Sequence, residues 1–231
     1  MRLLRSARND KENKRTNILN LTIFAGTFNP IHIAHLIVVE SVRTELNAEK
    51  ILFIPSFIPP FKNGDVAEAV HRLNMVKLAI KNNPHFEVSD IELKLQGTSY
   101  SFNTIQELYR QNPEIEGRIN FIIGADAFNH IETWYKHEEL AKLINFIVLA
   151  RPNYNLNCHS EPKCNAELVS ASKTLKQVQG DGFIHYQFVE APRIDISSSY
   201  IRQRIKEKKS IKYLVTNEVE NYIIENKLYL S

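Results

Sequence analysis

Two histidines, His32 and His35, lie three residues apart in the segment GTFNPIHIAH, which spans residues 26 to 35. They open an apolar-periodic segment, so on a helix their side chains would share one face. Their ring nitrogens could donate to phosphate oxygens beside the free N–H groups and partial positive charge of the helix N-terminus. Each histidine alone is better explained by structure, with His32 capping the helix and His35 partly buried. The pair predicts a phosphate site, whereas a zinc site would need a third ligand that the neighbouring sequence lacks.

A second group of residues with similar chemistry lies near the C-terminus, in the segment DISSSYIR from Asp195 to Arg202. One of Ser197, Ser198 and Ser199 is expected to cap the helix that follows. The other hydroxyls, the free N–H groups and the guanidinium of Arg202 would form a phosphate clamp, because arginine binds phosphate oxygens bidentately. Taken alone, the segment is explained as well by helix capping as by phosphate binding.

The first motif is typical of a strand, a tight loop and a helix N-terminus in succession. The apolar run Leu21–Ala25 predicts the strand. Gly26 would let the backbone turn and approach a ligand, and Pro30 fixes φ immediately before the helix. The two histidines are therefore expected at the carboxyl end of a strand.

Strand-like and helix-like segments alternate along the rest of the chain. Strands are predicted at Leu21–Ala25, Ile51–Ile54, Ile119–Ile123, Phe146–Leu149 and Phe183–Val189. Helices are predicted at Ile33–Leu46, Val66–Lys81, Phe102–Gln111, His137–Leu143, Ser198–Lys208 and Val215–Asn226. In Val66–Lys81 the apolar residues recur at helical spacing, with Arg72, Lys77 and Lys81 expected on the outer face. The alternation predicts one α/β domain at residues 18–231 with a doubly wound, mostly parallel sheet, which binds ligands at the carboxyl ends of its strands.

The length and composition are those of a globular domain of 231 residues, of which 43% are hydrophobic and 24% charged. No apolar stretch approaches the roughly 18 residues that span a bilayer, so no membrane partner is expected. The net charge of +3 suits anionic small molecules but is too small to argue for nucleic-acid binding. The two cysteines, Cys158 and Cys164, imply no disulfide framework and fit a reducing, cytoplasmic compartment.

Two polar segments fall outside the alternation. Residues 1–17 are basic and lack the apolar core of a secretory signal, so a poorly ordered tail is predicted. Residues 153–182 are polar and turn-rich, which predicts a surface excursion. Within it, Cys158, His159 and Cys164 lack a C-x-x-C pair and make only a weak metal motif.

The two motifs together resemble those of nucleotidyltransferases whose signatures are (G/S)-(T/S)-F-(D/N)-P-x-H-x-x-H and I-S-S-S-x-x-R. Further segments resemble the bacterial nicotinate-nucleotide adenylyltransferases: IPSFIPPFK, HRLNMVKLAI, GTSYSFNTIQEL, FIIGADAF, TWYKHEEL and IKYLVTNEVENYI. The resemblance covers roughly Leu21–Arg151 and Ala191–Leu228. Several motifs in the same order are far more specific than any one of them.

The resemblance implies a Rossmann-like fold and a reaction of NAD biosynthesis. ATP and nicotinate mononucleotide would give deamido-NAD and pyrophosphate, with Mg²⁺ bound mainly through the ATP phosphates. No protein ligand for the metal can be named from the sequence. The oligomeric state is not indicated either.

The resemblance also implies roles for individual residues. The catalytic residues would be His32, His35 and Arg202, and the ATP-binding residues would be Gly26, Thr27, Phe28, His32, His35, Gly124, Ser198, Ser199 and Arg202. The mononucleotide-binding residues would be Lys62, Ser99, Tyr100, Ser101, Asp126, Trp134 and Tyr135.

Three of these mononucleotide residues have a simpler alternative role. Trp134 would stack on the nicotinate ring or pack in the core. Asp126 would contact a ribose or orient the mononucleotide, and could also cap a helix that starts at Ala127. Lys62 would meet the substrate phosphate or be a solvated surface lysine. The nicotinate carboxylate would be held by backbone N–H groups near Tyr135 and in the Ser99–Ser101 turn.

The chain departs from the family pattern at four positions. Phe61 stands where histidine is frequent, Ala25 and Ala34 where glycine is frequent, and Asn29 where aspartate is commoner. Phe61 removes one donor for a phosphate. Two alternatives stay open: an adenylyltransferase for nicotinamide mononucleotide or another phosphate-bearing acceptor such as phosphopantetheine, and a nucleotide-binding protein without catalysis.

Overall fold

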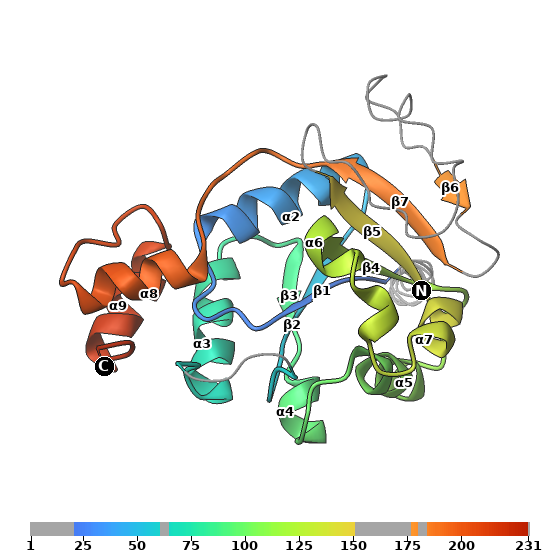
Figure 1. The fold of residues 1–231 in the computed structure, drawn as a ribbon, viewed down its shortest axis with the longest axis horizontal. Helices are drawn as coiled ribbons and strands as arrows, with labels where there is room; N and C mark the ends of the chain where they lie inside the picture. The colour runs from blue at the N-terminus through green and yellow to red at the C-terminus, as the bar shows by residue number, and fades with distance from the viewer. Residues whose placement is uncertain (1–20, 61–64, 151–176, 180–183, 231) are drawn as a thin grey trace, which may run out of the picture.

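The computed structural model describes residues 21–60, 65–150, 177–179 and 184–230. Its centre is a seven-stranded sheet in the order β3-β2-β1-β4-β5-β7-β6 (Figure 1). The strands are β1 Thr22–Gly26, β2 Ile51–Pro55, β3 Phe86–Val88, β4 Ile119–Gly124, β5 Ile144–Ala150, β6 Gln177–Gln179 and β7 His185–Glu190. All ladders from β3 to β7 are parallel, and β6 pairs antiparallel with β7 at the edge. The prediction of a doubly wound, mostly parallel sheet is confirmed.

Helices cover both faces of the sheet (Figure 1). They are α2 Ile33–Glu45, α3 Ala69–Ile80, α4 Ile91–Leu95, α5 Ser101–Gln111, α6 Ala125–Phe128, the 3-10 helix η1 Ile131–Thr133, α7 His137–Leu143, α8 Ser198–Lys206 and α9 Asn217–Glu225. One hydrophobic core lies beneath α2, α3, α8 and α9, and a second beneath α5 and α7. In the part of the chain that the structure describes, no helix is long and apolar enough to cross a membrane.

Some short elements were not expected from the sequence. Strand β3 has three residues and a charged centre at Glu87, and α4 is a single short helix. The 1–17 tail lies outside the described residues, as does most of the 153–182 excursion. The exception is β6, so this part of the expected surface excursion is a strand paired with β7.

The placement of Arg72 contradicts the sequence prediction. Its side chain was expected on the outer face of the helix but is only 1% exposed. It lies in the first turn of α3, within hydrogen-bond distance of the loops that follow β1 and β2. Main-chain oxygens of those loops accept its hydrogen bonds, so a cation is solvated by protein there.

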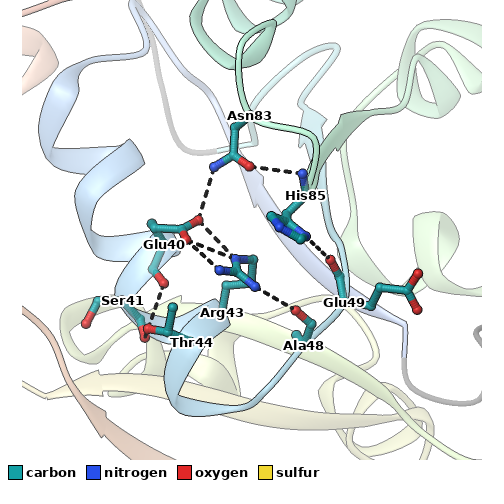
Figure 2. Close-up of polar contacts among 8 residues, drawn as sticks. All are labelled: Glu40, Ser41, Arg43, Thr44, Ala48, Glu49, Asn83 and His85. Carbon is teal, nitrogen blue, oxygen red and sulfur yellow. Dashed lines mark hydrogen bonds and ion pairs between the residues drawn. The ribbon is translucent and has the colours of Figure 1, made fainter.

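A polar network ties α2 to the loops at the amino ends of β2 and β3 (Figure 2). The Arg43 guanidinium donates to the Glu40 carboxylate, with Nη2 at 2.7 Å from Oε1. Asn83 donates to the same carboxylate at 3.1 Å, and the ring of His85 lies 2.9 Å from the carbonyl oxygen of Glu49. The Arg43 guanidinium keeps the pKa of Glu40 below its usual value. This network lies at the amino ends of the strands, whereas the predicted ligand site lies at their carboxyl ends.

Candidate active site

The predicted phosphate motif lies at the switch point of the sheet. Strand β1 pairs with β2 on one side and with β4 on the other. The chain runs outward from β1 through β2 to β3 and then returns to add β4 on the opposite side of β1, so the strand order reverses there. Parallel sheets bind ligands in the crevice at such a point. The loop from Thr27 to Ile31 follows β1 directly, and α2 begins at Ile33 with His32 at the N-cap. The predicted strand, loop and helix are therefore confirmed.

The two histidines are stacked on each other at the start of α2. Their ring centroids are 3.6 Å apart and the rings are inclined by 24°. The N–H of His32 donates to Nδ1 of His35 at 3.2 Å, which places the ring proton of His35 on Nε2. His32 is buried, and burial lowers its pKa to about 4, so its ring is neutral near pH 7. Its Nδ1 is buried with no hydrogen-bond partner among the described residues.

The buried side chain of Phe28 packs against the ring of His35. Its side chain is 3% exposed, and its ring meets that of His35 edge-on at 5.5 Å. Its backbone is in the left-handed region, with φ at 48°. A Cβ added to Gly26 would lie 3.2 Å from the Phe28 ring, which is tighter than most real contacts. A larger residue at position 26 would therefore require the Phe28 ring to shift, a packing reason for Gly26 that the sequence motif does not reveal.

Helix α8 brings the second motif onto this loop. The hydroxyl of Ser198 donates to the carbonyl oxygen of Pro30 at 2.9 Å. Nη1 of Arg202 donates to the carbonyl oxygen of Asn29 at 2.8 Å, and Nη2 lies 3.4 Å from Oγ of Ser199. Nε of Arg202 is buried without a partner among the described residues. The two motifs, more than 160 residues apart in the chain, form one site.

Helix capping accounts for one serine of the second motif, as the sequence predicted. Oγ of Ser197 accepts from the N–H of Tyr200 at 3.1 Å, which makes Ser197 the cap of α8. Ser198 is thereby left for the loop and Ser199 for Arg202.

The predicted mononucleotide residues come from two neighbouring segments. Ser99, Tyr100 and Ser101 lead into α5, and the ring of Tyr100 lies 4.7 Å from that of Tyr135. Tyr135 is 46% exposed, and Nζ of Lys136 lies over its ring at 5.4 Å.

A pocket of about 110 Å³ lies beside these residues. Its lining includes Glu92, Gly97, Ser99, Tyr100 and Thr104. The structure thus brings the Ser99 segment and Tyr135 together next to a hollow.

Trp134 and Asp126 are placed in more detail by the structure. Trp134 is half-buried and meets Phe121 edge-on at 6.1 Å, so part of its indole packs on the core while stacking on a ligand stays a prediction. The predicted cap role of Asp126 is wrong, because the helix begins at Ala125 and Gly124 is its N-cap. The Asp126 carboxylate lies in the first turn, where the helix dipole favours negative charge.

Lys62, with Phe61, lies outside the described residues.

The side chain of Asn29 joins the loop after β1 to two distant segments, and no pattern in the sequence predicts these contacts. Nδ2 donates to the carbonyl oxygen of Asp65 at 2.7 Å, and Oδ1 accepts from the N–H of Ala67 at 3.0 Å. Oδ1 also accepts from the hydroxyl of Tyr229 at 2.8 Å, 200 residues away in the chain. Burial raises the pKa of Tyr229, so its hydroxyl keeps its proton and remains a donor.

Comparison with known proteins shows the family of this chain. The family model described as cytidylyltransferase-like matches residues 23–204. A nicotinate-nucleotide adenylyltransferase of Bacillus subtilis is 35% identical over 210 residues, with 90% of this chain and 97% of that protein covered. A protein of Caldicellulosiruptor bescii named probable nicotinate-nucleotide adenylyltransferase is 36% identical over 211 residues, with 91% and 99% covered.

A solved structure shares the fold. The Plasmodium falciparum nicotinic acid mononucleotide adenylyltransferase complexed with NaAD superposes with a TM-score of 0.67 at 21% identity, covering 91% of this chain and 97% of that one. The sequence matches, which extend over nine-tenths of the chain, show more than the fold. The chain belongs to the cytidylyltransferase-like family and, within it, to the nicotinate-nucleotide adenylyltransferases.

Proposed function

We propose that the chain transfers the adenylyl group of ATP to nicotinate mononucleotide, giving deamido-NAD and pyrophosphate. The observation that carries this proposal is the docking of α8 on the loop after β1, which gathers phosphate donors at the N-terminus of α2. Two buried nitrogens there, Nδ1 of His32 and Nε of Arg202, have no partner among the described residues. Buried polar atoms are normally paired, so these two suit a ligand. The acceptor follows from the family membership.

The proposed chemistry is an in-line displacement at the α-phosphorus of ATP. An oxygen of the mononucleotide 5′-phosphate forms a bond to that phosphorus, and the bond to the departing pyrophosphate breaks. A phosphate monoester is already an adequate nucleophile near neutral pH, so no covalent enzyme intermediate is needed. Catalysis then consists of positioning the two substrates and stabilising the charge that develops on pyrophosphate.

The residues of the first site suit this stabilisation. Nε2–H of His35 and the guanidinium of Arg202 are groups that can donate hydrogen bonds to phosphate oxygens, and the helix dipole adds partial positive charge where His32 itself is neutral. Because His32 is neutral, its part is a hydrogen bond and not a full charge.

The second substrate is assigned to the surface between Tyr100 and Tyr135. The N–H groups of Ser99, Tyr100 and Asn103 already donate to main-chain oxygens, so they do not serve the carboxylate as the sequence predicted. Helix α5 has no side-chain cap, and the N–H groups of Ser101 and Phe102 in its first turn could bind a carboxylate such as that of nicotinate. The neighbouring indole of Trp134 and the ring of Tyr135 offer aromatic faces to the pyridine ring.

Magnesium is the expected cofactor, and its binding is a further part of the proposal. The site residues are imidazole, hydroxyl and guanidinium groups, which suit phosphate oxygens better than Mg²⁺, an ion that prefers oxygen ligands. Among the described residues, no group of three or more His, Cys, Asp or Glu side chains is arranged to hold a metal. The ion would therefore arrive on the ATP phosphates, where it neutralises charge.

The test is pyrophosphate release from ATP and Mg²⁺ with three separate acceptors: nicotinate mononucleotide, its amide and phosphopantetheine. Release is expected with nicotinate mononucleotide and much less with the others. Equal or faster turnover of the amide would overturn the stated specificity. No turnover with any acceptor would favour a binding protein without catalysis.

A further inference from the structure

The buried guanidinium of Arg72 has no part in the chemistry proposed above. It lies in α3 and is only 1% exposed. Among the described residues it forms no ion pair, and its close partners are uncharged main-chain oxygens. Burying a cation costs free energy, and neutral oxygens offset this cost less than a carboxylate would. An arginine at this position therefore calls for a specific reason.

Those oxygens belong to three different loops. Nη1 donates to the carbonyl oxygens of Thr27 at 2.8 Å and Ser56 at 2.6 Å. Nη2 donates to the carbonyl oxygen of Phe57 at 2.8 Å, and Nε donates to that of Ala67 at 2.7 Å. One planar group thus joins the loop after β1, the loop after β2 and the segment that leads into α3.

The loop after β2 is in turn bonded to the predicted mononucleotide segment. The N–H of Phe57 donates to Oγ of Ser99 at 2.7 Å and to Oε2 of Glu92 at 3.1 Å. The N–H of Ser99 donates to the carbonyl oxygen of Ile58 at 2.8 Å. The buried carboxylate of Glu92 also accepts from the hydroxyl of Thr104 at 2.7 Å. A continuous set of hydrogen bonds therefore runs from Thr27, through Arg72, to Ser99.

We propose that Arg72 is a positioning residue that fixes the separation between the loop assigned to ATP and the segment assigned to the mononucleotide. This inference rests on the proposed function. In-line attack requires the reacting atoms to be held about 3 to 3.5 Å apart, and a misplacement of about 1 Å can cost roughly a hundredfold in rate. Arginine suits this task because its donors form a rigid planar fork, whereas lysine has three donors on one nitrogen.

The test is Arg72→Lys, which keeps the charge and loses the fork. Its kcat is expected to fall about a hundredfold per folded molecule, because the two substrates are held at the wrong separation. The dissociation constants of ATP and of nicotinate mononucleotide, each measured alone by calorimetry, are expected to change less than about threefold, since each loop is still formed.

A matched control lies on the same helix. Met75 is fully buried one turn after Arg72 and belongs to the core beneath the helix. Met75→Ala should lower the melting temperature while kcat stays within about threefold of wild type. A similar loss of kcat in both variants would overturn the proposal, since any damage to α3 would then suffice.

Two other results would overturn it as well. One is a near-normal kcat in Arg72→Lys. The other is a loss that appears wholly as weaker binding of one substrate. If Arg72→Lys does not fold, Thr104→Val decides, because it removes a hydrogen bond to Glu92, the carboxylate that helps hold the N–H of Phe57 beside Ser99. It should lower kcat about tenfold with both dissociation constants unchanged, and a normal kcat would contradict the proposal.

Failure of the proposed function is distinguishable from failure of this inference. If the wild-type chain does not use nicotinate mononucleotide, the function is wrong. If it does and Arg72→Lys turns over normally, only the role of Arg72 is wrong.

Discussion

One region of the molecule lies at the amino ends of the parallel strands, here called the amino edge of the sheet. There Arg43 and Glu40 pair within one turn of α2, and Asn83 and His85 belong to the same polar network (Figure 2). At the carboxyl edge, the loop after β1 is held by side chains from α3, α8 and the C-terminal segment, up to 200 residues away. That loop also contains a left-handed Phe28 and adjoins two buried nitrogens without described partners. Unsatisfied polar atoms and strained backbone gather where a protein acts on another molecule. The polar groups of the amino edge bond to one another, whereas the carboxyl edge carries the loop that we propose binds phosphates.

Among substitutions in the two regions, His35→Ala should have the largest effect on turnover. Turnover should fall about a hundredfold or more, in line with the loss of one preorganised donor to the developing charge. Steady-state pyrophosphate release measures it, and circular dichroism should show an intact fold. Near-normal turnover would leave His35 with only a structural role at the start of α2.

A pH titration of stability tests the burial of His32. Its pKa is lowered to about 4 in the folded chain, whereas the unfolded chain has the ordinary value of 6.5. The unfolded state therefore binds more protons below pH 6.5, and stability is full above that pH and falls as the pH drops toward 4. The expected loss between pH 7.5 and pH 4.5 is about 2.5 kcal/mol.

Urea unfolding of the wild type and of His32→Asn at several pH values measures this loss. The variant has no ring to protonate, so its stability should vary less across the same range. Equal pH dependence in the two proteins would show that His32 is not the group responsible.

Tyr229→Phe tests whether the C-terminal segment holds the loop. The change removes one of two donors to Oδ1 of Asn29 in a buried place, so the free energy of unfolding should fall by about 1 to 2 kcal/mol. Tyr213→Phe is the matched control, because Tyr213 is 78% exposed and should tolerate the change. If both variants unfold alike, the hydrogen bond to Asn29 contributes little.

Arg43→Ala, at the amino edge, should have the smallest effect on stability and turnover. The pair with Glu40 is partly exposed and local, so its loss should cost less than about 1 kcal/mol of stability. Turnover should stay within about twofold of wild type. A tenfold loss of turnover would show that the amino edge is coupled to the site.

Much of the fold could be predicted because burial leaves a direct trace in the sequence. The apolar runs at β1, β2, β4 and β5 were found to within a few residues, since central parallel strands are buried on both faces. Strand β3 was missed because its three residues, Phe86 to Val88, include an exposed glutamate and form no apolar run. Strand β6 was missed for a similar reason, because two of its three residues are glutamines.

The two motifs of the candidate site could be predicted from the sequence, but the contacts that hold the loop between them could not. The family resemblance predicts that the motifs around His32 and Arg202 meet, and helix α8 does dock on the loop before α2. Helical periodicity predicts Arg72 on the outer face, because periodicity does not show that main-chain oxygens of two distant loops meet the first turn of α3. The partnership of Asn29 with Tyr229 spans 200 residues and has no local signal.

The most direct test of the central claim follows the label from ATP. With ATP labelled at the α-phosphorus, adding nicotinate mononucleotide and Mg²⁺ to the wild-type chain should move the label into deamido-NAD. With ATP labelled at the γ-phosphorus, the label should leave in pyrophosphate. Label in the dinucleotide from the α-position alone is the predicted result. Release of the γ-label as free phosphate, or no transfer of the α-label, would contradict the proposed adenylyl transfer.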